Sequence, residues 1–269
     1  MPPILRVSNS LDRDRMSFRF DLHVHSLLSH DGSILPGPAL ARKIKSRGLD
    51  GIALTDHDTT RNVVRFVSVL GDAGLVAIPG EEVRASNGAE ILCFFTTATI
   101  KPKMHWTEIL DEVRSQGAIA VLSHPFDYLR GNWMGELSAK HRDSRLALLR
   151  GVDGLETFNA RNYSPGGNWL AHRYASAAGL RETAGSDAHV LFEIGLTWTE
   201  IESASSNPDD LLAAFQRGNV APHFREELGV VPVPGYTARR AVASVVKKTA
   251  SGLSSAFSPV KRWLAVISR

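Results

Sequence analysis

The chain has 269 residues, 43% of them hydrophobic, which suffices for one α/β barrel or two small domains. Its single cysteine, Cys93, excludes an internal disulfide framework, and no 18-residue apolar run or signal-peptide pattern occurs near the N-terminus, so we expect a cytoplasmic protein. The net charge of +3 is uneven, because residues 236–269 carry seven Lys or Arg and no Asp or Glu, which leaves 24 basic and 28 acidic residues in the body.

Strands and helices alternate along most of the sequence. Residues 1–17 lack periodicity, and we expect them to form a loose leader. Short apolar runs predict strands at 18–25, 49–54, 75–79, 90–95, 118–122 and 152–158. Helical spacing predicts helices between them and beyond at 36–47, 59–73, 105–116, 137–150 and 169–178. This alternation predicts a parallel sheet.

Residues that commonly bind metals follow several of these predicted strands. His23 and His25 are one residue apart in the first strand, so period-two alternation points both imidazoles to the same side. Similar residues follow later strands, in the segments Asp56–Asp58, Gly80–Glu82, Ser123–Pro125 and Gly185–His189. A β/α barrel assembles its site at the carboxyl ends of its strands. An open doubly wound sheet usually uses two or three strands, so five or more contributing strands favour a closed ring.

Two of these segments also have an ordinary structural explanation. Asp58 could cap the helix that follows it, whereas His57 has no such role and is a candidate ligand. Glu81 and Glu82 could be a charged turn, but strand alternation sends one carboxylate inward, and we choose Glu82. A carboxylate can bridge two cations, which an imidazole nitrogen cannot do.

The candidate ligands outnumber those that one four-coordinate ion requires. The strand ends supply five histidines, two aspartates and one glutamate, so we expect two or three divalent ions. Mixed imidazole and carboxylate ligands suit zinc, manganese or iron, and the near absence of thiolate excludes a cysteine-type structural zinc site. Paired divalent ions activate water and stabilise the oxygens of a phosphoryl group, so phosphoester hydrolysis is the expected chemistry.

The ordered motifs DLHVHS with Asp31 behind it, TDHD, PGxE, HP and SDAH resemble the polymerase-and-histidinol-phosphatase (PHP) superfamily of metal-dependent phosphoesterases. The resemblance covers roughly residues 18–200 and implies a distorted (β/α)7 TIM-like barrel with a metal cluster at the carboxyl ends of the strands. Residues 154–162 resemble bacterial members with a PHP-associated C-terminal segment. We therefore expect a barrel with this segment over residues 18–235 and a basic amphipathic tail over residues 236–269.

The resemblance also implies a role for each ligand. One ion would be held by His23, His25, Glu82 and Asp187. Glu82 would also bridge to a second ion, which His124 would bind. A third ion would be held by Asp31, His57 and His189. Manganese, zinc or iron would serve in these sites, and magnesium is a further candidate.

Two positions depart from the pattern of several relatives. Some members carry another histidine near the end of the fourth strand, but residues 91–96 have none, which predicts an incomplete or weakly occupied second site. Asp31 stands where some relatives have histidine, and its carboxylate would favour manganese, magnesium or iron. We expect the remaining histidines to lie on the surface, away from the site: His30, His105, His141, His172 and His223.

Two arginines are candidates for binding the phosphate of a substrate. Arg130 follows the His124-Pro125 motif, and Arg161 follows the predicted strand at 152–158. A guanidinium can bind phosphate oxygens through two parallel hydrogen bonds, although loop arginines are often only solvated. Neither arginine is expected to bind metal.

We expect the chain to hydrolyse a small phosphomonoester, a nucleotide or a short oligonucleotide with metal-activated water. The alternatives are a nuclease for longer DNA or RNA, a metal-binding accessory module without turnover, and an amide hydrolase on a similar barrel. The basic tail bears on this choice, because its apolar residues recur at roughly helical spacing. Such a helix could lie on the acidic body, on a membrane surface or on nucleic acid. The oligomeric state stays open.

Overall fold

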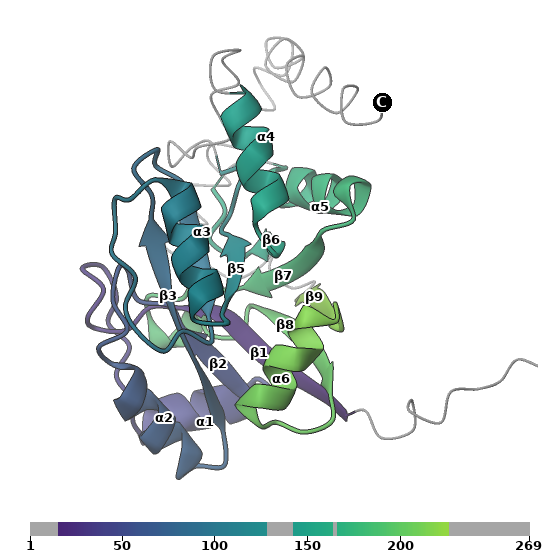
Figure 1. Cartoon of the computed structure of the whole chain (residues 1–269). Coiled ribbons are helices and arrows are strands. Elements are labelled where there is room, and N and C mark those ends of the chain that lie inside the picture. Colours follow the sequence, from purple (N-terminus) through teal and green to yellow (C-terminus); the bar gives the residue numbers. More distant parts are fainter. Residues whose placement is uncertain (1–15, 128–141, 164–165, 226–269) are drawn as a thin grey trace, which may run out of the picture.

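Nine strands form one curved, nearly closed sheet in the computed structural model, which describes residues 16–127, 142–163 and 166–225 (Figure 1). The strand order is β7-β6-β5-β4-β3-β2-β1-β8-β9. The strands are β1 (Met16–Val24), β2 (Gly51–Leu54), β3 (Val76–Arg84), β4 (Glu90–Phe94), β5 (Ile119–Leu122), β6 (Gly154–Asn159), β7 (Arg181–Gly185), β8 (Thr197–Ser203) and β9 (Val220–Phe224). The expected α/β barrel is confirmed, with a strand count that matches (β/α)7 only approximately.

The sheet is not parallel throughout, which corrects the expectation from the sequence. β1, β2 and β3 are parallel, as are β5, β6 and β7, but β4 is antiparallel to both of its neighbours. Only residues 85–89 separate β3 from β4, and a parallel pair needs a crossover of about a dozen residues or more. A tight turn in which Ala85 N donates to Ala89 O joins the two strands. The first residue of β4, Glu90, therefore lies beside the last residues of β3.

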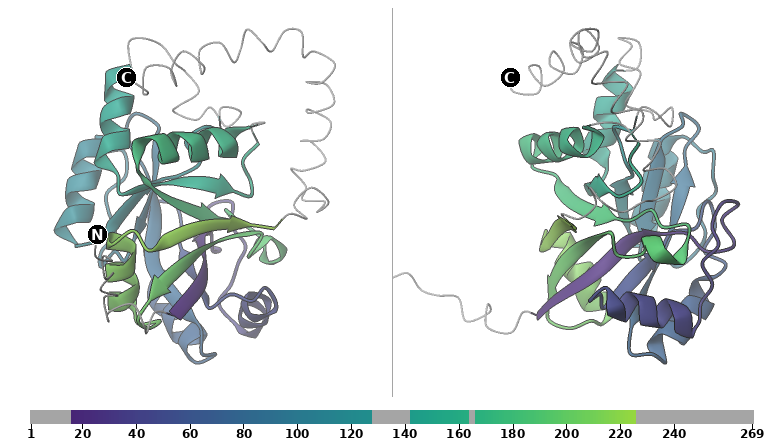
Figure 2. Two further views of the ribbon diagram at one scale, coloured as in Figure 1. Left: turned by 90° about the vertical axis from the view of Figure 1, so that its right-hand side faces the viewer. Right: turned by 180° about the vertical axis from the view of Figure 1, so that it is seen from behind.

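Helices cover the outer side of the sheet (Figures 1 and 2). They are α1 (Pro38–Ser46), α2 (Val63–Gly71), α3 (Trp106–Ser115), α4 (Arg142–Gly151), α5 (Gly167–Ala178) and α6 (Pro208–Gln216). The predicted helices are present with bounds that differ by a few residues, and Asn62 rather than Asp58 precedes the first turn of α2. Within the described ranges, no helix is both long enough and apolar enough to cross a membrane.

Apolar side chains fill the barrel interior at the end where β4 finishes. Phe20 from β1 and Phe94, the last residue of β4, belong to one buried cluster. α6 adds Leu211 and Phe215 to this cluster, and the rings of Phe94 and Phe215 lie 6.2 Å apart. The interior at this end is a packed core, so within the barrel the room for a polar cluster lies at the opposite end.

The patterns in the sequence did not predict β8, α6 or β9, which lie within residues 197–224. In β8 the buried positions are Thr197, Thr199, Ile201 and Ser203. Only one of these is hydrophobic, so the strand lacks the apolar alternation that identifies a half-buried strand. The Thr199 hydroxyl instead donates to Ala184 O at 2.9 Å and accepts from Ala184 N at 2.8 Å, which ties β8 to β7.

Several predictions from the sequence lie partly or wholly outside the described residues. They concern the leader up to residue 15, residues 137–141 of a predicted helix, Arg130, His141 and the basic tail at 236–269. Met16 and Ser17, which were assigned to the leader, belong to β1. The strand begins earlier than predicted because Met16 pairs with Ser203 and Ser17 with Glu202 in β8.

Gly185, the last residue of β7, packs directly against β1. A Cβ atom at this position would lie 2.3 Å from His23 Cβ and 2.7 Å from His23 N, distances that real structures do not tolerate. We expect Gly185→Ala to lower the free energy of unfolding by about 3 kcal/mol or more, measured by urea denaturation. Gly71→Ala in α2 is the control, because nothing lies within 4 Å of its Cβ position, and equal unfolding midpoints for the two variants would contradict the prediction.

Candidate metal centre

The eight predicted ligand side chains lie together at the end of the barrel opposite the apolar core. They come from the end of β1 and the loop after it, from β3, and from the segments after β2, β5 and β7. They are His23, His25, Asp31, His57, Glu82, His124, Asp187 and His189. Asp31 is 44% exposed and marks the mouth of the site, whereas His23 and His25 are fully buried at its base.

His23 and His25 face each other, with their Nε2 atoms 3.0 Å apart. Nδ1 of His23 lies 2.9 Å from a carboxylate oxygen of Glu156, and an ionised carboxylate only accepts, so this nitrogen carries a proton. The Ser29 hydroxyl donates to Asp56 and therefore accepts from Nδ1 of His25, 3.1 Å away. Burial lowers the pKa of His23, but the surrounding carboxylates outweigh burial and raise it well above its ordinary value. A cation shared by the two Nε2 atoms would take the place of the proton that this environment favours on His23.

Glu82 lies at the centre of the cluster. Its Oε2 atom is 3.1 Å from Nδ1 of His57 and 3.5 Å from Nε2 of His23. Its Oε1 atom is 3.3 Å from Nε2 of His124 and accepts a hydrogen bond from the Ser123 hydroxyl at 2.7 Å. The two carboxylate oxygens thus face different imidazoles, which is what a carboxylate that bridges two ions requires.

The segment after β7 runs beside the end of β1. His25 N donates to Ala188 O at 2.8 Å, and Ala188 N donates to His23 O at 3.1 Å. Asp187 has a φ of 56°, a left-handed conformation that is uncommon outside glycine and is often found at functional sites. Its Oδ1 atom lies 3.4 Å from Nε2 of His25. The backbone pairing therefore brings Asp187 next to two histidines that precede it by more than 160 positions.

Asp31, His57 and His189 form the outer part of the cluster. The two carboxylate oxygens of Asp31 lie 3.5 Å from Nε2 of His57 and 3.0 Å from Nε2 of His189. Nδ1 of His189 lies 2.8 Å from the carbonyl oxygen of Asp187, to which it donates, so Nε2 is the nitrogen that can bind an ion. These three side chains are placed together as the resemblance implied.

The donor set suits cations. Burial lowers the pKa of His25 to about 3, so this imidazole is neutral and can act as a ligand. Burial also lowers the pKa of His57, but its hydrogen bond to Glu82 and the charge of that carboxylate outweigh burial and raise the pKa to about 9. Burial would raise the pKa of Glu82, but the charge of His23 and hydrogen bonds to His124, His23 and His57 hold it well below its usual range. The carboxylate of Glu82 thus stays charged in a buried site, and divalent ions would neutralise it.

Three groups of ligand atoms lie within 4.8 Å of one another and match the expected sites in part. His23 and His25 group with Asp187, and His23 also groups with Glu82 and His124. His57 groups with His25 and His189. The geometry is therefore compatible with two or three ions, as the number of ligands predicted.

Buried carboxylates outside the predicted set hold the ligands in place. Glu156 in β6 accepts from His23 Nδ1, from His124 N at 2.9 Å and from Asn159 Nδ2 at 3.0 Å. A carboxylate behind a ligating histidine fixes its tautomer and raises its basicity. Glu156 was not among the predicted residues, although an acidic residue within the strand predicted at 152–158 is a signal that could have identified it.

Asp56 has a similar supporting function rather than a place among the ligands. Its carboxylate accepts from Ser26 N and from the Ser26 hydroxyl, both at 2.6 Å, and from the Ser29 hydroxyl at 3.0 Å. These bonds fix the loop after β1. Asp58 does not cap a helix either, since its carboxylate accepts from Arg84 N at 3.0 Å.

Glu81 points away from the cluster, as strand alternation predicted. Its Oε1 atom accepts from Ile100 N at 2.7 Å, and burial raises the pKa of its carboxyl to about 7. His30 differs from the prediction, because it lies at the mouth with Nε2 3.8 Å from Asp31. It lies in a turn after β1, where the alternation of a strand does not apply.

The predicted ligands open into a pocket of about 230 Å³. Arg161 lies in its wall, and its guanidinium contacts Glu193 at 3.4 Å and donates to the Tyr163 hydroxyl at 3.2 Å. Arg84 and Glu90, which were not among the predicted site residues, also line the pocket. A pocket of this volume with arginines in its wall can admit a small anionic group.

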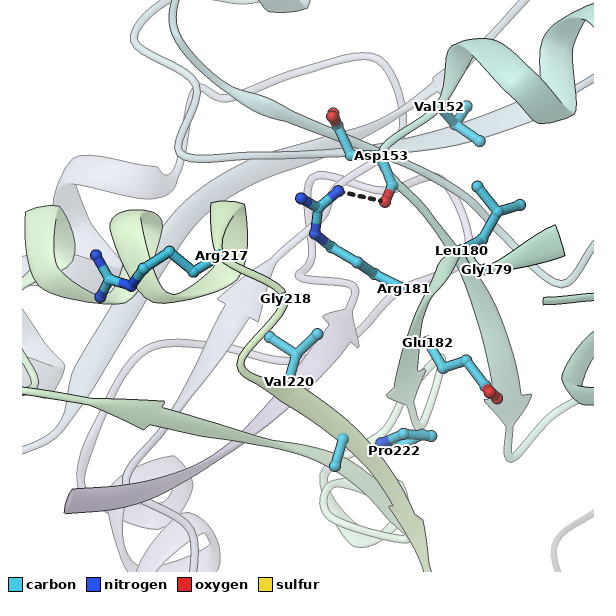
Figure 3. A pocket seen from close by; sticks show the side chains of 11 residues that line it. Val152, Asp153, Gly179, Leu180, Arg181, Glu182, Arg217, Gly218, Val220 and Pro222 are labelled. Atoms are coloured by element: carbon cyan, nitrogen blue, oxygen red, sulfur yellow. Dashed lines mark hydrogen bonds between the residues drawn. The ribbon is translucent and has the colours of Figure 1, made fainter. Parts of the chain in front are cut away.

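A second pocket, of about 560 Å³, lies where β6, β7 and β9 begin, at the opposite end of the barrel (Figure 3). Figure 3 shows that Arg181 reaches the main chain of Asp153, whereas Arg217 extends away from it. Arg181 donates to the carbonyl oxygens of Asp153, at 3.2 Å, and Gln216, at 2.5 Å. Its guanidinium thus links the start of β6 to the end of α6, which is a structural function.

Two family models match the chain. One is described as the PHP domain and matches residues 21–159, just over half of the chain, and the other is described as PHP-associated and matches residues 165–220. An uncharacterized protein of Methanocaldococcus jannaschii is 32% identical over 194 residues, which cover 72% of this chain and 75% of that protein.

Solved structures share the fold. A two-domain protein from Bacteroides vulgatus, described as containing a predicted PHP-like metal-dependent phosphoesterase, superposes with a TM-score of 0.64 at 20% identity. The match covers 80% of this chain and 66% of that chain, just under two thirds of its length. A lesion-specific endonuclease from Pyrococcus furiosus superposes with a TM-score of 0.53 at 16% identity. This match covers 77% of the present chain and 58% of the endonuclease. At these identities the likeness concerns the fold alone.

Proposed function

The chain belongs to the PHP domain family, and on this premise we propose that it is a metal-dependent hydrolase of phosphoric esters. The observation that supports this most is the central position of Glu82, whose two oxygens face imidazoles on different sides. Such a carboxylate is needed where ions act as a pair. An accessory module that merely binds one ion would not require it.

We assign the ions to the residues that the resemblance implied. The first would be held by His23, His25, Glu82 and Asp187, the second by Glu82 and His124, and the third by Asp31, His57 and His189. Manganese, zinc or iron suits these ligands, and magnesium is a further candidate. When bound, such ions lower the pKa of water and withdraw charge from a phosphoryl group.

The side chains of the protein supply position and charge. Glu156 holds the His23 ring with its protonated nitrogen directed away from the cluster, and Asp56 fixes the serine that holds His25. Arg161 lies in the pocket wall, where a guanidinium can bind non-bridging phosphate oxygens. The pocket volume favours a small phosphomonoester, a nucleotide or the end of a short oligonucleotide.

Hydrolysis assays with manganese test this function. The full-length protein should cleave 4-nitrophenyl phosphate faster than the diester bis(4-nitrophenyl) phosphate, chelation should abolish the reaction, and added manganese should restore it. His23→Ala should be inactive under every condition, because it removes a ligand at the base of the site. Turnover of the monoester that is unchanged by chelation, or by His23→Ala, would refute the proposal.

A nuclease acting on longer DNA or RNA is the second candidate. The observation that favours it is the basic segment 236–269, with seven Lys or Arg and no acidic residue. Binding of oligonucleotides that weakens steeply with salt, and that loses this dependence when residues 236–269 are deleted, would favour the nuclease. We also propose a cytoplasmic location, because the only cysteine, Cys93, is buried and needs no oxidising compartment.

A further inference from the structure

We propose that Glu90 is a ligand of the second ion, together with Glu82 and His124. This inference rests on the proposed function, since it takes the cluster to be a metal centre. The second site was predicted to be incomplete because residues 91–96, toward the end of the fourth strand, contain no histidine. Because β4 runs antiparallel to β3, it is the start of that strand that lies at the site.

The pairing of β3 with β4 places Glu90 on the correct face. Glu82 pairs with Leu92, and Arg84 pairs with Glu90. Directly opposed residues of an antiparallel pair have side chains on the same face, and so do residues two apart in one strand. Leu92 on this face is buried in the apolar interior, and Glu90 lies one step nearer the mouth. Glu90 is therefore the first side chain of β4 that can reach the cluster.

The distances fit a shared ion better than a direct hydrogen bond. Oε2 of Glu90 lies 3.7 Å from Nε2 of His124, which is itself 3.3 Å from Oε1 of Glu82. The first distance is too long for a hydrogen bond. Ligands bound at about 2.1 Å around one ion are themselves separated by about 3 to 4 Å. His57, Glu82 and Glu90 also present ligand atoms within 4.8 Å of one another.

The two oxygens of Glu90 have different surroundings. Arg84 makes both of its contacts to Oε1, one of them from Nε at 3.0 Å, while Oε2 is the oxygen that faces His124. The ion pair with Arg84 therefore leaves the oxygen nearest the cluster available to an ion. With two carboxylates and one imidazole, the second site would prefer manganese or magnesium over zinc.

The competing explanation is that Glu90 serves only as the partner of Arg84. Two variants separate these explanations. Glu90→Gln removes the charge of the ligand and also breaks the ion pair, whereas Arg84→Gln breaks the ion pair and leaves the carboxylate in place. A third variant, Glu90→His, offers an imidazole to the ion but has no negative charge with which to form an ion pair with Arg84.

The test is the manganese content and affinity of the full-length protein, measured by elemental analysis after titration. Glu90→Gln should lose one ion per chain or bind it about 10- to 100-fold more weakly, with Arg84→Gln close to wild type and Glu90→His partly restored. Wild-type binding in Glu90→Gln, or equal losses in Glu90→Gln and Arg84→Gln, would overturn this inference alone. Wild-type protein that binds no manganese, zinc or iron would overturn it together with the proposed function.

Discussion

Replacing Glu82 with Gln is expected to lower the rate of phosphomonoester hydrolysis by more than about 100-fold. This loss exceeds the about 10- to 100-fold loss that is typical when a residue that hydrogen-bonds to a metal ligand is replaced. The substitution keeps the shape of the side chain but removes the negative charge between His23, His57 and His124. Because one side chain faces two proposed sites, the metal content should fall by more than one ion per chain. Initial rates with 4-nitrophenyl phosphate and elemental analysis of the same samples measure both effects.

Glu81→Gln is the matched control for this experiment. It changes the neighbouring residue in the same way, but Glu81 faces Ile100 N on the other side of the strand, and a glutamine oxygen can still accept that hydrogen bond. We expect its metal content and activity to stay within about twofold of wild type, because surface and supporting groups away from the ligands have small effects. If Glu81→Gln and Glu82→Gln reduce metal content equally, the central position assigned to Glu82 is wrong.

Asp21→Asn is expected to destabilise the fold by about 3 kcal/mol. Asp21 in β1 is fully buried, and its Oδ1 atom accepts from Ser186 N at 2.8 Å and from His23 N at 3.3 Å. Oδ2 accepts from Gly195 N at 2.8 Å and from the Ser186 hydroxyl. An asparagine amide group in place of one oxygen would face N–H donors and leave buried groups without acceptors.

The free energy of unfolding, measured by urea denaturation at constant pH, checks this prediction. The control is Asp111→Asn in α3, a side chain that is 76% exposed and contacts Arg114 only on the surface. We expect the control to change stability by less than about 0.5 kcal/mol. A loss for Asp21→Asn no larger than that of the control would mean that the link between β1 and the segment after β7 contributes little.

The positions of the candidate ligands could be predicted because histidine and acidic residues are conspicuous after short apolar runs. His57 and His124 follow strands whose residues are all buried, so their departure from the apolar pattern marks the end of the barrel where they lie. The choice of Glu82 over Glu81 followed from alternation within a strand, which is a local property. Alternation within a single strand therefore sufficed to place these side chains.

The remaining features depend on contacts between distant segments. The reversal of β4 is decided by the five-residue turn at 85–89, whose Asn87-Gly88 pair is a hairpin signal that the alternation of strands and helices obscured. β8 buries threonine and serine at positions where an apolar residue would mark a strand, and the Thr199 hydroxyl meets its partner, Ala184, only in the folded barrel. Asp21 and Glu156 are buried acidic residues within strands, and their function depends on segments that follow or precede them by more than 130 positions.

The number of ions bound by the wild-type protein tests the central claim most directly. Elemental analysis of full-length protein, purified without chelator and loaded with manganese, should give two to three ions per chain, because the ligands form overlapping groups around Glu82. Denatured protein carried through the same procedure gives the background. A value below one ion per chain would contradict the account, since the buried carboxylates would then be neutralised by protonated histidines alone.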